Sequence, residues 1–199
     1  MKITENTLES YRTKTDNELI VDCKNHDEQA FRELMDRYMK QIFNFTKQYS
    51  KTTEDAEDIT QDTFLKVWKY IGRYTRDRSF KPWLYMIARN TALDFLKKKK
   101  SLSFSELDDI ENDLFFTDTV VDNEPSPEEL FANSVIIKEL SKVMEDIHPD
   151  HRAILVMHYH EDMTFDEIST IIGKPMNTVK SWHRRALIKL QKKLMHQKS

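Results

Sequence analysis

The apolar residues of this chain recur every three or four positions, which is the spacing of one face of an α-helix. No run alternates apolar and polar residues over the length of a strand. Only two glycines and five prolines occur in 199 residues, fewer than the turns of a barrel or sandwich require. The pattern therefore predicts an all-α fold.

The predicted helices form two groups. The first group covers about 16–23, 27–49, 53–70 and 82–100, and the second covers about 128–147, 149–159, 164–172 and 177–190. Residues 101–127 between them are polar, acidic and without periodicity, which is typical of a linker. We expect an N-terminal tail at 1–14 and two small helical domains at 15–100 and 128–199, joined by the acidic linker.

The segment 164–190, TFDEISTIIGKPMNTVKSWHRRALIKL, carries the signals of a helix-turn-helix. Thr164 and Glu167 have capping-box spacing at the start of the first helix. Gly173 is placed to end that helix, and Pro175 follows as a stop. Two short helices joined by a tight turn are typical of DNA-binding proteins.

The second helix of this motif, for which Asn177 is the predicted cap, has two different sides. The apolar side consists of Val179, His183, Ala186 and Leu190, and the basic side consists of Lys180, Ser181, Arg184 and Arg185. A helix of this kind fits the DNA major groove. A surface helix with solvated charges is the alternative, but the preceding helix and turn favour DNA binding.

The net charge of −3 hides a strong segregation of charge along the chain. Residues 64–100 contain eleven basic and two acidic residues, and residues 174–199 contain eight basic residues and no acidic one. Residues 101–137, by contrast, contain ten acidic residues and no basic one. Two cationic modules separated by an anionic connector indicate contact with phosphate backbones.

Aromatic residues are interleaved with the basic residues of segment 73–100. They are Tyr74, Phe80, Trp83 and Tyr85. Because unpaired bases stack on aromatic rings while cations follow the backbone, the segment indicates a single-stranded nucleic acid as ligand. Burial in the core is the alternative for Trp83 and Tyr85. Phe80 is expected in a surface loop with three arginines, Arg73, Arg76 and Arg78.

The segment 55–68, DAEDITQDTFLKVW, has an acidic edge opposite a broad apolar face. The edge consists of Asp55, Asp58, Gln61 and Asp62. It would repel phosphate but could dock on a basic protein surface. Acidic residues near the start of a helix also favour the helix dipole, so the spacing leaves both explanations open.

Other candidate chemistry is sparse. The one cysteine, Cys23, cannot form an internal disulfide, which suits a reducing compartment, and we expect a small buried side chain rather than a reactive thiol. His148, His151, His158 and His160 cluster, but their spacing differs from zinc-binding motifs. We predict no metal site, no cofactor and no catalytic activity. No signal region or run of 18 apolar residues occurs, so we expect a cytoplasmic protein without membrane insertion.

Three segments, in this order and spacing, resemble the bacterial extracytoplasmic-function (ECF) sigma factors, the smallest class of the sigma-70 family. DAEDITQDTFLKVW is similar to the segment that binds the clamp helices of the largest polymerase subunit. FKPWLYMIARNTALDFLKKKK is similar to the segment that melts and reads the −10 promoter element. Residues 148–190 are similar to the −35-binding domain. The resemblance covers about 28–100 and 130–195, most of the chain.

The resemblance implies roles for particular residues of this sequence. Core polymerase would be bound by Asp55, Asp58, Gln61, Asp62 and Lys66. The −10 element would be bound by Arg73, Tyr74, Arg76, Arg78, Phe80, Lys81, Trp83, Arg89, Asn90, Asp94 and Lys97. The −35 element would be bound by Thr178, Lys180, Ser181, Trp182, Arg184, Arg185 and Lys189. A base of the non-template strand would flip into a pocket at the loop 76–81.

The recognition helix departs from the family pattern at two positions. Members usually have Ser-Arg-Leu-X-Arg-Ala where this chain has SWHRRA, residues 181–186. Trp182 replaces a common arginine at the flank of the helix, where it either packs on the scaffold or lies against a sugar. His183 replaces a leucine.

The implied partners are core RNA polymerase, through the clamp helices and the flap of the second-largest subunit, and promoter DNA, both duplex and single-stranded. Many members also bind an anti-sigma factor, although the sequence identifies none. A plain helix-turn-helix regulator is the first alternative, but it explains neither the acidic edge nor the aromatic-basic segment. An adaptor that only binds protein is the second, and the charge excess of residues 73–100 argues against it.

Overall fold

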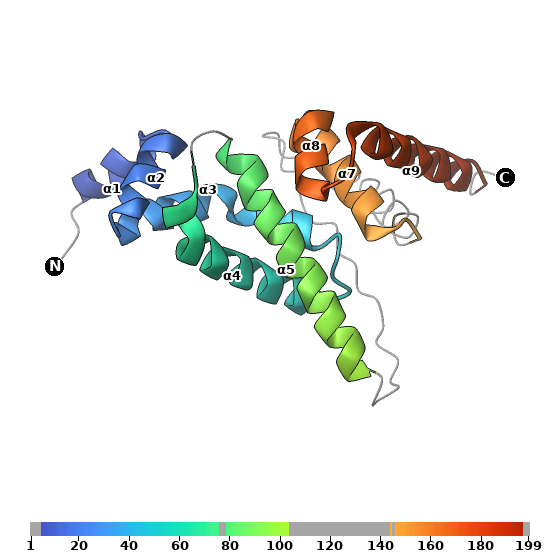
Figure 1. The fold of residues 1–199 in the computed structure, drawn as a ribbon, viewed down its shortest axis with the longest axis horizontal. Helices are drawn as coiled ribbons and strands as arrows, with labels where there is room; N and C mark the ends of the chain where they lie inside the picture. The colour runs from blue at the N-terminus through green and yellow to red at the C-terminus, as the bar shows by residue number, and fades with distance from the viewer. Residues whose placement is uncertain (1–4, 76–78, 104–143, 145, 197–199) are drawn as a thin grey trace, which may run out of the picture.

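The computed structural model describes residues 5–75, 79–103, 144 and 146–196 (Figure 1). Every regular element in these residues is helical, which confirms the predicted all-α fold. In chain order the elements are α1 (Glu5–Arg12), α2 (Asp16–Lys24), α3 (Glu28–Thr46), α4 (Thr53–Tyr70), the short 3-10 helix η1 (Ile71–Arg73), α5 (Phe80–Ser103), α7 (Pro149–Tyr159), α8 (Phe165–Ile172) and α9 (Met176–His196).

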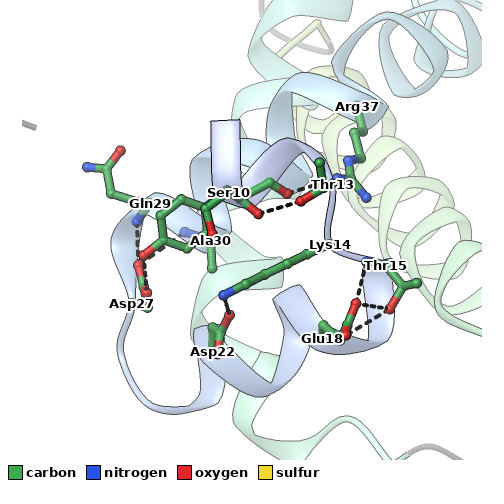
Figure 2. Close-up of polar contacts among 11 residues, drawn as sticks. Ser10, Thr13, Lys14, Thr15, Glu18, Asp22, Asp27, Gln29, Ala30 and Arg37 are labelled. Atoms are coloured by element: carbon green, nitrogen blue, oxygen red, sulfur yellow. Dashed lines mark hydrogen bonds and ion pairs between the residues drawn. The ribbon is translucent and has the colours of Figure 1, made fainter. Parts of the chain in front are cut away.

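Helices α2 and α3 each start next to a capping side chain, close to the positions that the sequence predicts. Thr15 opens α2 with a capping box, in which the Thr15 backbone N–H donates to the Glu18 carboxylate at 2.7 Å (Figure 2). Asp27 caps α3 by accepting from the backbone N–H groups of Gln29 and Ala30. These side chains satisfy N–H groups that the first turn of a helix leaves without partners.

The helix-turn-helix also begins and turns as predicted. Thr164 and Glu167 form a second capping box at the start of α8, and Gly173 ends that helix at a φ of 66°. Glycine adopts this left-handed conformation without the steric cost of a Cβ. α9 begins one residue earlier than predicted, because the Pro175 carbonyl already accepts from N–H groups of the first turn. Asn177 is therefore not its cap, and that prediction is wrong.

Helices α3, α4 and α5 pack around the core of the N-terminal domain. The core includes Leu34, Ile42, Phe45, Ile59, Val67, Leu84 and Tyr85. Helix α1 packs against α3, although the sequence predicted only a tail at 1–14. The Arg37 guanidinium of α3 donates to the carbonyls of Tyr11 and Arg12, and this contact between distant segments has no local sequence signal.

Helices α7, α8 and α9 form the C-terminal domain, in which each helix packs against the other two. Its core includes Ala153, Ile154, Met157, Ile168, Ile171 and Val179. The predicted apolar side of α9 faces inward, because Val179 and Ala186 are buried and His183 and Leu190 are half-buried.

The two helical domains pack directly against each other. Helix α5 lies against α8, and α3 contacts α7. The larger cluster of buried apolar side chains extends through both domains, and a second, smaller cluster lies within the C-terminal domain. The domains therefore share an interface in this structure, and that interface includes part of the basic segment.

Helix α5 starts at Phe80, two residues before the predicted start, and continues through Ser103 into the predicted linker. The rest of that linker, at 104–127, and most of the predicted helix at 128–147 lie outside the described residues. The domain boundaries in this part of the chain stay predictions. No helix among the described residues is long and apolar enough to cross a membrane.

Candidate nucleic-acid and protein interfaces

The outer face of α4 combines polar side chains with an exposed leucine. Asp58, Gln61 and Asp62 are all exposed, as the sequence predicts. Leu65 lies beside them at i+3 and i+4 spacing, and its side chain is 67% exposed. A large exposed apolar side chain on a polar face suits contact with a protein partner, because its burial would then be favourable.

The sequence pattern does not single out Leu65. Phe64 and Trp68 belong to the buried face of the same helix, and an apolar run there does not show that one member points outward. Helical geometry does indicate that Leu65 is exposed, because positions 58, 61, 62 and 65 lie on one side of a helix.

Asp55 and Lys66 are paired with α5. Lys99 donates to the two carboxylate oxygens of Asp55 at 3.0 and 2.8 Å. Lys66 lies 3.7 Å from the Asp94 carboxylate. These two predicted core-binding residues therefore tie α4 to α5, and they lie at the edge of the exposed α4 face.

Phe80 is buried at 5% exposure, so its predicted place in a surface loop is wrong. The centre of its ring lies 5.6 Å from that of Tyr38, 5.8 Å from that of Tyr74 and 5.7 Å from that of Trp83. Aromatic contacts of this kind stabilise a core. Phe80, which makes them, is the first residue of α5, so the helix begins two residues before Pro82. Tyr74 is also buried, whereas Trp83 keeps part of its ring exposed. In this arrangement Trp83 alone of these three −10 candidates has ring surface open to a base.

Four of the other −10 candidates are exposed, and two, Lys81 and Arg89, pair with the C-terminal domain. The exposed ones are Arg73, Asn90, Asp94 and Lys97. Asn90, Asp94 and Lys97 share one side of α5 at i, i+4 and i+7. Arg76 and Arg78 lie outside the described residues.

Lys81 and Arg89 contact two carboxylates of the C-terminal domain. The Arg89 guanidinium donates to both oxygens of Asp150, with Nε–Oδ1 at 3.0 Å and Nη2–Oδ2 at 2.9 Å. The Tyr49 hydroxyl donates to the same carboxylate at 3.0 Å. Lys81 Nζ lies 3.0 Å from the Glu161 carboxylate and donates to the Glu161 carbonyl at 2.9 Å. Both carboxylate residues are buried.

These carboxylates stay ionised because their partners outweigh burial. Burial alone would raise the pKa of Asp150, but the hydrogen bonds and charge of Arg89 hold that pKa below its ordinary value. Burial also opposes ionisation of Glu161, whose pKa is lowered by hydrogen bonds from Lys81 and His160. Neither acid was selected from the sequence, since their partners lie 61 and 80 residues away and follow no spacing rule.

The basic side of α9 faces away from the core. Its exposed candidates are Lys180, Ser181, Arg184, Arg185 and Lys189, and Thr178 is half-buried. Lys180 Nζ lies over the Phe165 ring at 5.8 Å, and Lys189 donates to the Asp146 carbonyl. This surface has the charge and the exposure that contact with a DNA groove requires.

The two departures in the recognition helix contribute to packing between helices. The Trp182 ring lies 5.0 Å from that of His151 in α7, so it packs on the scaffold, one of the two positions left open by the sequence. A ring nitrogen of His183 lies 3.1 Å from the Tyr159 hydroxyl, and its ring contacts Phe165. Burial lowers the pKa of both histidines and so favours their neutral forms.

Cys23 is buried, and burial raises the pKa of its thiol to about 12. The thiol therefore stays protonated at neutral pH, as expected for a small packed side chain. His148 and His151 contact each other, whereas His158 and His160 have other partners. Within the described part of the chain, no three His, Cys, Asp or Glu side chains gather in an arrangement that could hold a metal ion.

Two family models match the chain. The model of sigma-70 region 2 matches residues 34–102, and that of sigma-70 region 4 matches residues 137–190. The ECF RNA polymerase sigma factor SigW of Bacillus subtilis is 27% identical over 177 residues, covering 88% of this chain and 94% of that protein. The RNA polymerase sigma-H factor of Pseudomonas aeruginosa is 26% identical, covering 90% of this chain and 93% of that protein.

Two solved structures share the fold. The sigma factor RpoE from Bartonella quintana, in complex with the anti-sigma factor NepR, has a TM-score of 0.68 at 20% identity, covering 83% of this chain and 96% of that chain. CnrH, in complex with the cytosolic domain of CnrY, has a TM-score of 0.65 at 19% identity, covering 92% and 99%. Because both sigma modules match in order and the relatives match over most of their length, the chain belongs to the ECF group of the sigma-70 family and is a non-enzymatic sigma factor for promoter-specific initiation by RNA polymerase.

Proposed function

We propose that this sigma factor uses separate helices for its three contacts: α4 for core polymerase, α5 for the melted −10 element and α9 for the −35 duplex. One observation carries this assignment. The chain exposes a carboxylate face around Leu65 on α4 and a basic face on α9. The first would repel DNA and the second would attract it, so the two faces suit different partners.

The proposed core contact centres on Leu65. Its apolar side chain would lose water on binding, which supplies affinity, while Asp58, Gln61 and Asp62 orient the complex against a basic surface. The clamp helices of the largest subunit are the proposed partner. Asp55 and Lys66 contribute indirectly by holding α4 on α5. The C-terminal domain is proposed to contact the flap of the second-largest subunit.

The −10 element is proposed to lie along the segment after η1 and the exposed side of α5. Trp83 offers a ring for stacking, while Tyr74 and Phe80 support the site from within the core. The polar contacts would come from Arg73, Arg76, Arg78, Lys81, Arg89, Asn90, Asp94 and Lys97. Extruding a base costs a few kcal/mol, which stacking worth roughly 1–3 kcal/mol per base can offset.

The −35 element is proposed to receive α9 in its major groove. Lys180, Ser181 and Arg184 would reach base edges, and Thr178, Arg185 and Lys189 would contact phosphates. Trp182 would set the position of the helix through its packing on α7.

An anti-sigma factor is a further proposed partner. Its support is the fold, since the similar RpoE structure contains such a protein. The cytoplasm is the proposed location, because the polymerase and the promoter DNA are there.

Run-off transcription tests the function as a whole. Purified core polymerase and fragments of the source genome are combined with or without this chain. We expect transcripts from discrete start sites only when the chain is present. A helix-turn-helix regulator would instead bind duplex fragments by itself and leave core polymerase unable to initiate at those sites. That result would reject the sigma-factor mechanism proposed for these helices.

A further inference from the structure

Helix α4 changes its charge along its length. Its last exposed carboxylate is Asp62. Residues 63–75, which complete α4 and continue through η1, contain no acidic side chain and have three basic ones, Lys66, Lys69 and Arg73. The first part of α4 therefore suits a basic partner, whereas its end and η1 suit an anionic one.

Tyr70 lies in this basic part. Among the described residues of the N-terminal domain it is the one exposed aromatic side chain, at 36% exposure. Lys69 Nζ and Arg73 Cζ each lie 5.7 Å from the centre of its ring. This distance is near the outer limit of a cation–π contact, about 6 Å, so neither cation is stacked tightly on the ring. An exposed ring beside two cations offers a stacking surface for a base and positive charge for the adjoining phosphates.

Two contacts show where Tyr70 lies relative to α5. Lys66 Nζ lies 3.7 Å from the Asp94 carboxylate, and the centre of the Tyr74 ring lies 5.1 Å from that of Trp83. Helices α4 and α5 are therefore antiparallel neighbours (Figure 1). Tyr70 is midway in sequence between Lys66 and Tyr74, and its i+4 spacing places it on the same side of α4 as Lys66. That side adjoins the surface of α5 proposed to bind −10 DNA.

The rings of Tyr70 and Trp83 lie at different points along this surface. Trp83 contacts Tyr74 directly. Tyr70 precedes Tyr74 by four residues, which corresponds to about 6–8 Å along a helix of α or 3-10 geometry. A base stacked on Trp83 therefore leaves Tyr70 available for another base of the same strand.

We propose that Tyr70 is a second stacking residue of the −10 site and holds a base of the melted non-template strand other than the base on Trp83. Lys69 and Arg73 attract the phosphates next to that base. The inference rests on the proposed binding of melted −10 DNA along α5. Because only an unpaired base can stack on the ring, Tyr70 stabilises the open complex and not the initial duplex complex.

The test compares holoenzymes that contain three variants of the full chain. Tyr70→Leu removes the ring, and Tyr70→Phe keeps it. Tyr159→Leu is the matched control, because it makes the same change at an exposed tyrosine of the C-terminal domain. The probe is a fluorescein-labelled fork-junction DNA without a −35 element. Its single-stranded part carries the non-template −10 sequence of a promoter mapped by run-off transcription, and binding is followed by fluorescence anisotropy.

We expect Tyr70→Leu to bind this probe at least about fivefold more weakly than the wild type, which is the lower range for the loss of one stacked base. Tyr70→Phe and Tyr159→Leu should bind like the wild type. Equal binding by Tyr70→Leu and Tyr159→Leu overturns the proposal. If Tyr70→Leu does not fold, Tyr70→Met replaces it with the same expected results.

Probes in which each −10 base in turn is replaced by an abasic site identify the stacked base. Removal of that base should weaken binding by the wild type but should not weaken binding by Tyr70→Leu any further, because both changes remove the same contact. Trp83→Leu should become insensitive at a different position. If every abasic site weakens the wild type and Tyr70→Leu by the same factor, Tyr70 stacks on no base and the proposal is overturned.

Two measurements distinguish stacking from an indirect effect of the ring. Tyr70→Leu should keep the wild-type slope of the logarithm of the binding constant against the logarithm of the salt concentration, whereas Arg73→Gln should lower that slope by about 1. A lowered slope in Tyr70→Leu shows that the ring only positions the cations. Weaker binding of Tyr70→Leu to core polymerase in a pull-down shows that the ring contacts protein. Either result overturns the proposal.

Asn90→Ala and Trp83→Leu test the proposed −10 role of α5 separately. If both variants bind the probe like the wild type, α5 is not the −10 site, and the role of Tyr70 is rejected with it. If both bind more weakly while Tyr70→Leu binds normally, the role of α5 is supported and only the role of Tyr70 is rejected.

Discussion

Phe80 and Trp83 lie one helical turn apart on α5, yet only Trp83 keeps part of its ring exposed. Tyr38 from α3 and Tyr74 after η1 pack against Phe80. The sequence around Phe80 could not reveal this burial, because Tyr38 comes from another helix. The exposed charges of α4 and α9 were predictable, since helical angle alone decides which side they occupy.

We expect Phe80→Ala to lower the free energy of unfolding by about 3–5 kcal/mol, because it empties a buried aromatic site. Trp83→Ala should lower the free energy of unfolding by less, since Trp83 is already partly exposed to water. Urea denaturation followed by circular dichroism measures both. A Phe80→Ala variant as stable as the wild type would show that the ring is not part of the core.

Arg184 is expected to read a base edge, whereas Lys189 is expected to contact a phosphate. Arg184→Ala should weaken binding to the −35 element by about 1–3 kcal/mol and reduce the sequence preference at one base pair. Lys189→Ala should weaken binding to all sequences alike. It should also lower, by about 1, the slope of the logarithm of the binding constant against the logarithm of the salt concentration. A set of −35 substitutions assayed with each holoenzyme distinguishes them. If Arg184→Ala lowers transcription equally on every template, Arg184 is not the base reader.

Helix α4 has a buried face toward α3 and α5 and a mixed face toward solvent. The boundaries of this helix were predictable because Thr52 and Thr53 precede a continuous amphipathic pattern. The exposure of Leu65 was harder to predict, because an apolar residue next to Phe64 is expected to be buried. The pairing of Asp55 with Lys99 depends on packing between helices, for which the sequence has no local pattern.

Asp58→Lys/Asp62→Lys should abolish binding to core polymerase and leave the helical circular dichroism spectrum unchanged, because both side chains are exposed. Leu65→Ala should weaken core binding by at least about 1 kcal/mol if it is a central anchor. Pull-down with purified core polymerase measures both effects. Glu9→Lys/Asp36→Lys, an equal charge reversal at exposed positions on α1 and α3, is the control. Equal loss of binding in the control would mean that net charge, and not the α4 face, governs the contact.

The closed packing of the two domains is a property of the whole molecule. Cap and stop signals predicted most helices and the helix-turn-helix, because those signals act within a few residues. The pairs Arg89–Asp150 and Lys81–Glu161 were not predictable, because many acids could have matched each cation. The interface follows from tertiary packing, which brings α5 against α8.

The pH dependence of closure follows from the lowered pKa values of Asp150 and Glu161. A lowered pKa in the folded state means that the stabilising charge is complete above the ordinary values of 3.8 and 4.5 and is lost as pH falls through the lowered ones. The radius of gyration should therefore increase on acidification below these ordinary values, before helicity is lost. Asp150→Asn/Glu161→Gln, which removes both charges, should show little further expansion over the same range. An equal expansion of both proteins would assign the effect to other carboxylates.

Permanganate footprinting of a mapped promoter tests most directly the claim that this chain makes core polymerase open the −10 element. The account predicts reactive thymines in the −10 region only when core polymerase and the chain are both present. It also predicts that Asp58→Lys/Asp62→Lys abolishes that reactivity while leaving the α9 surface intact. Protection of duplex DNA by the chain alone, with no reactive thymine when core polymerase is added, would contradict the account.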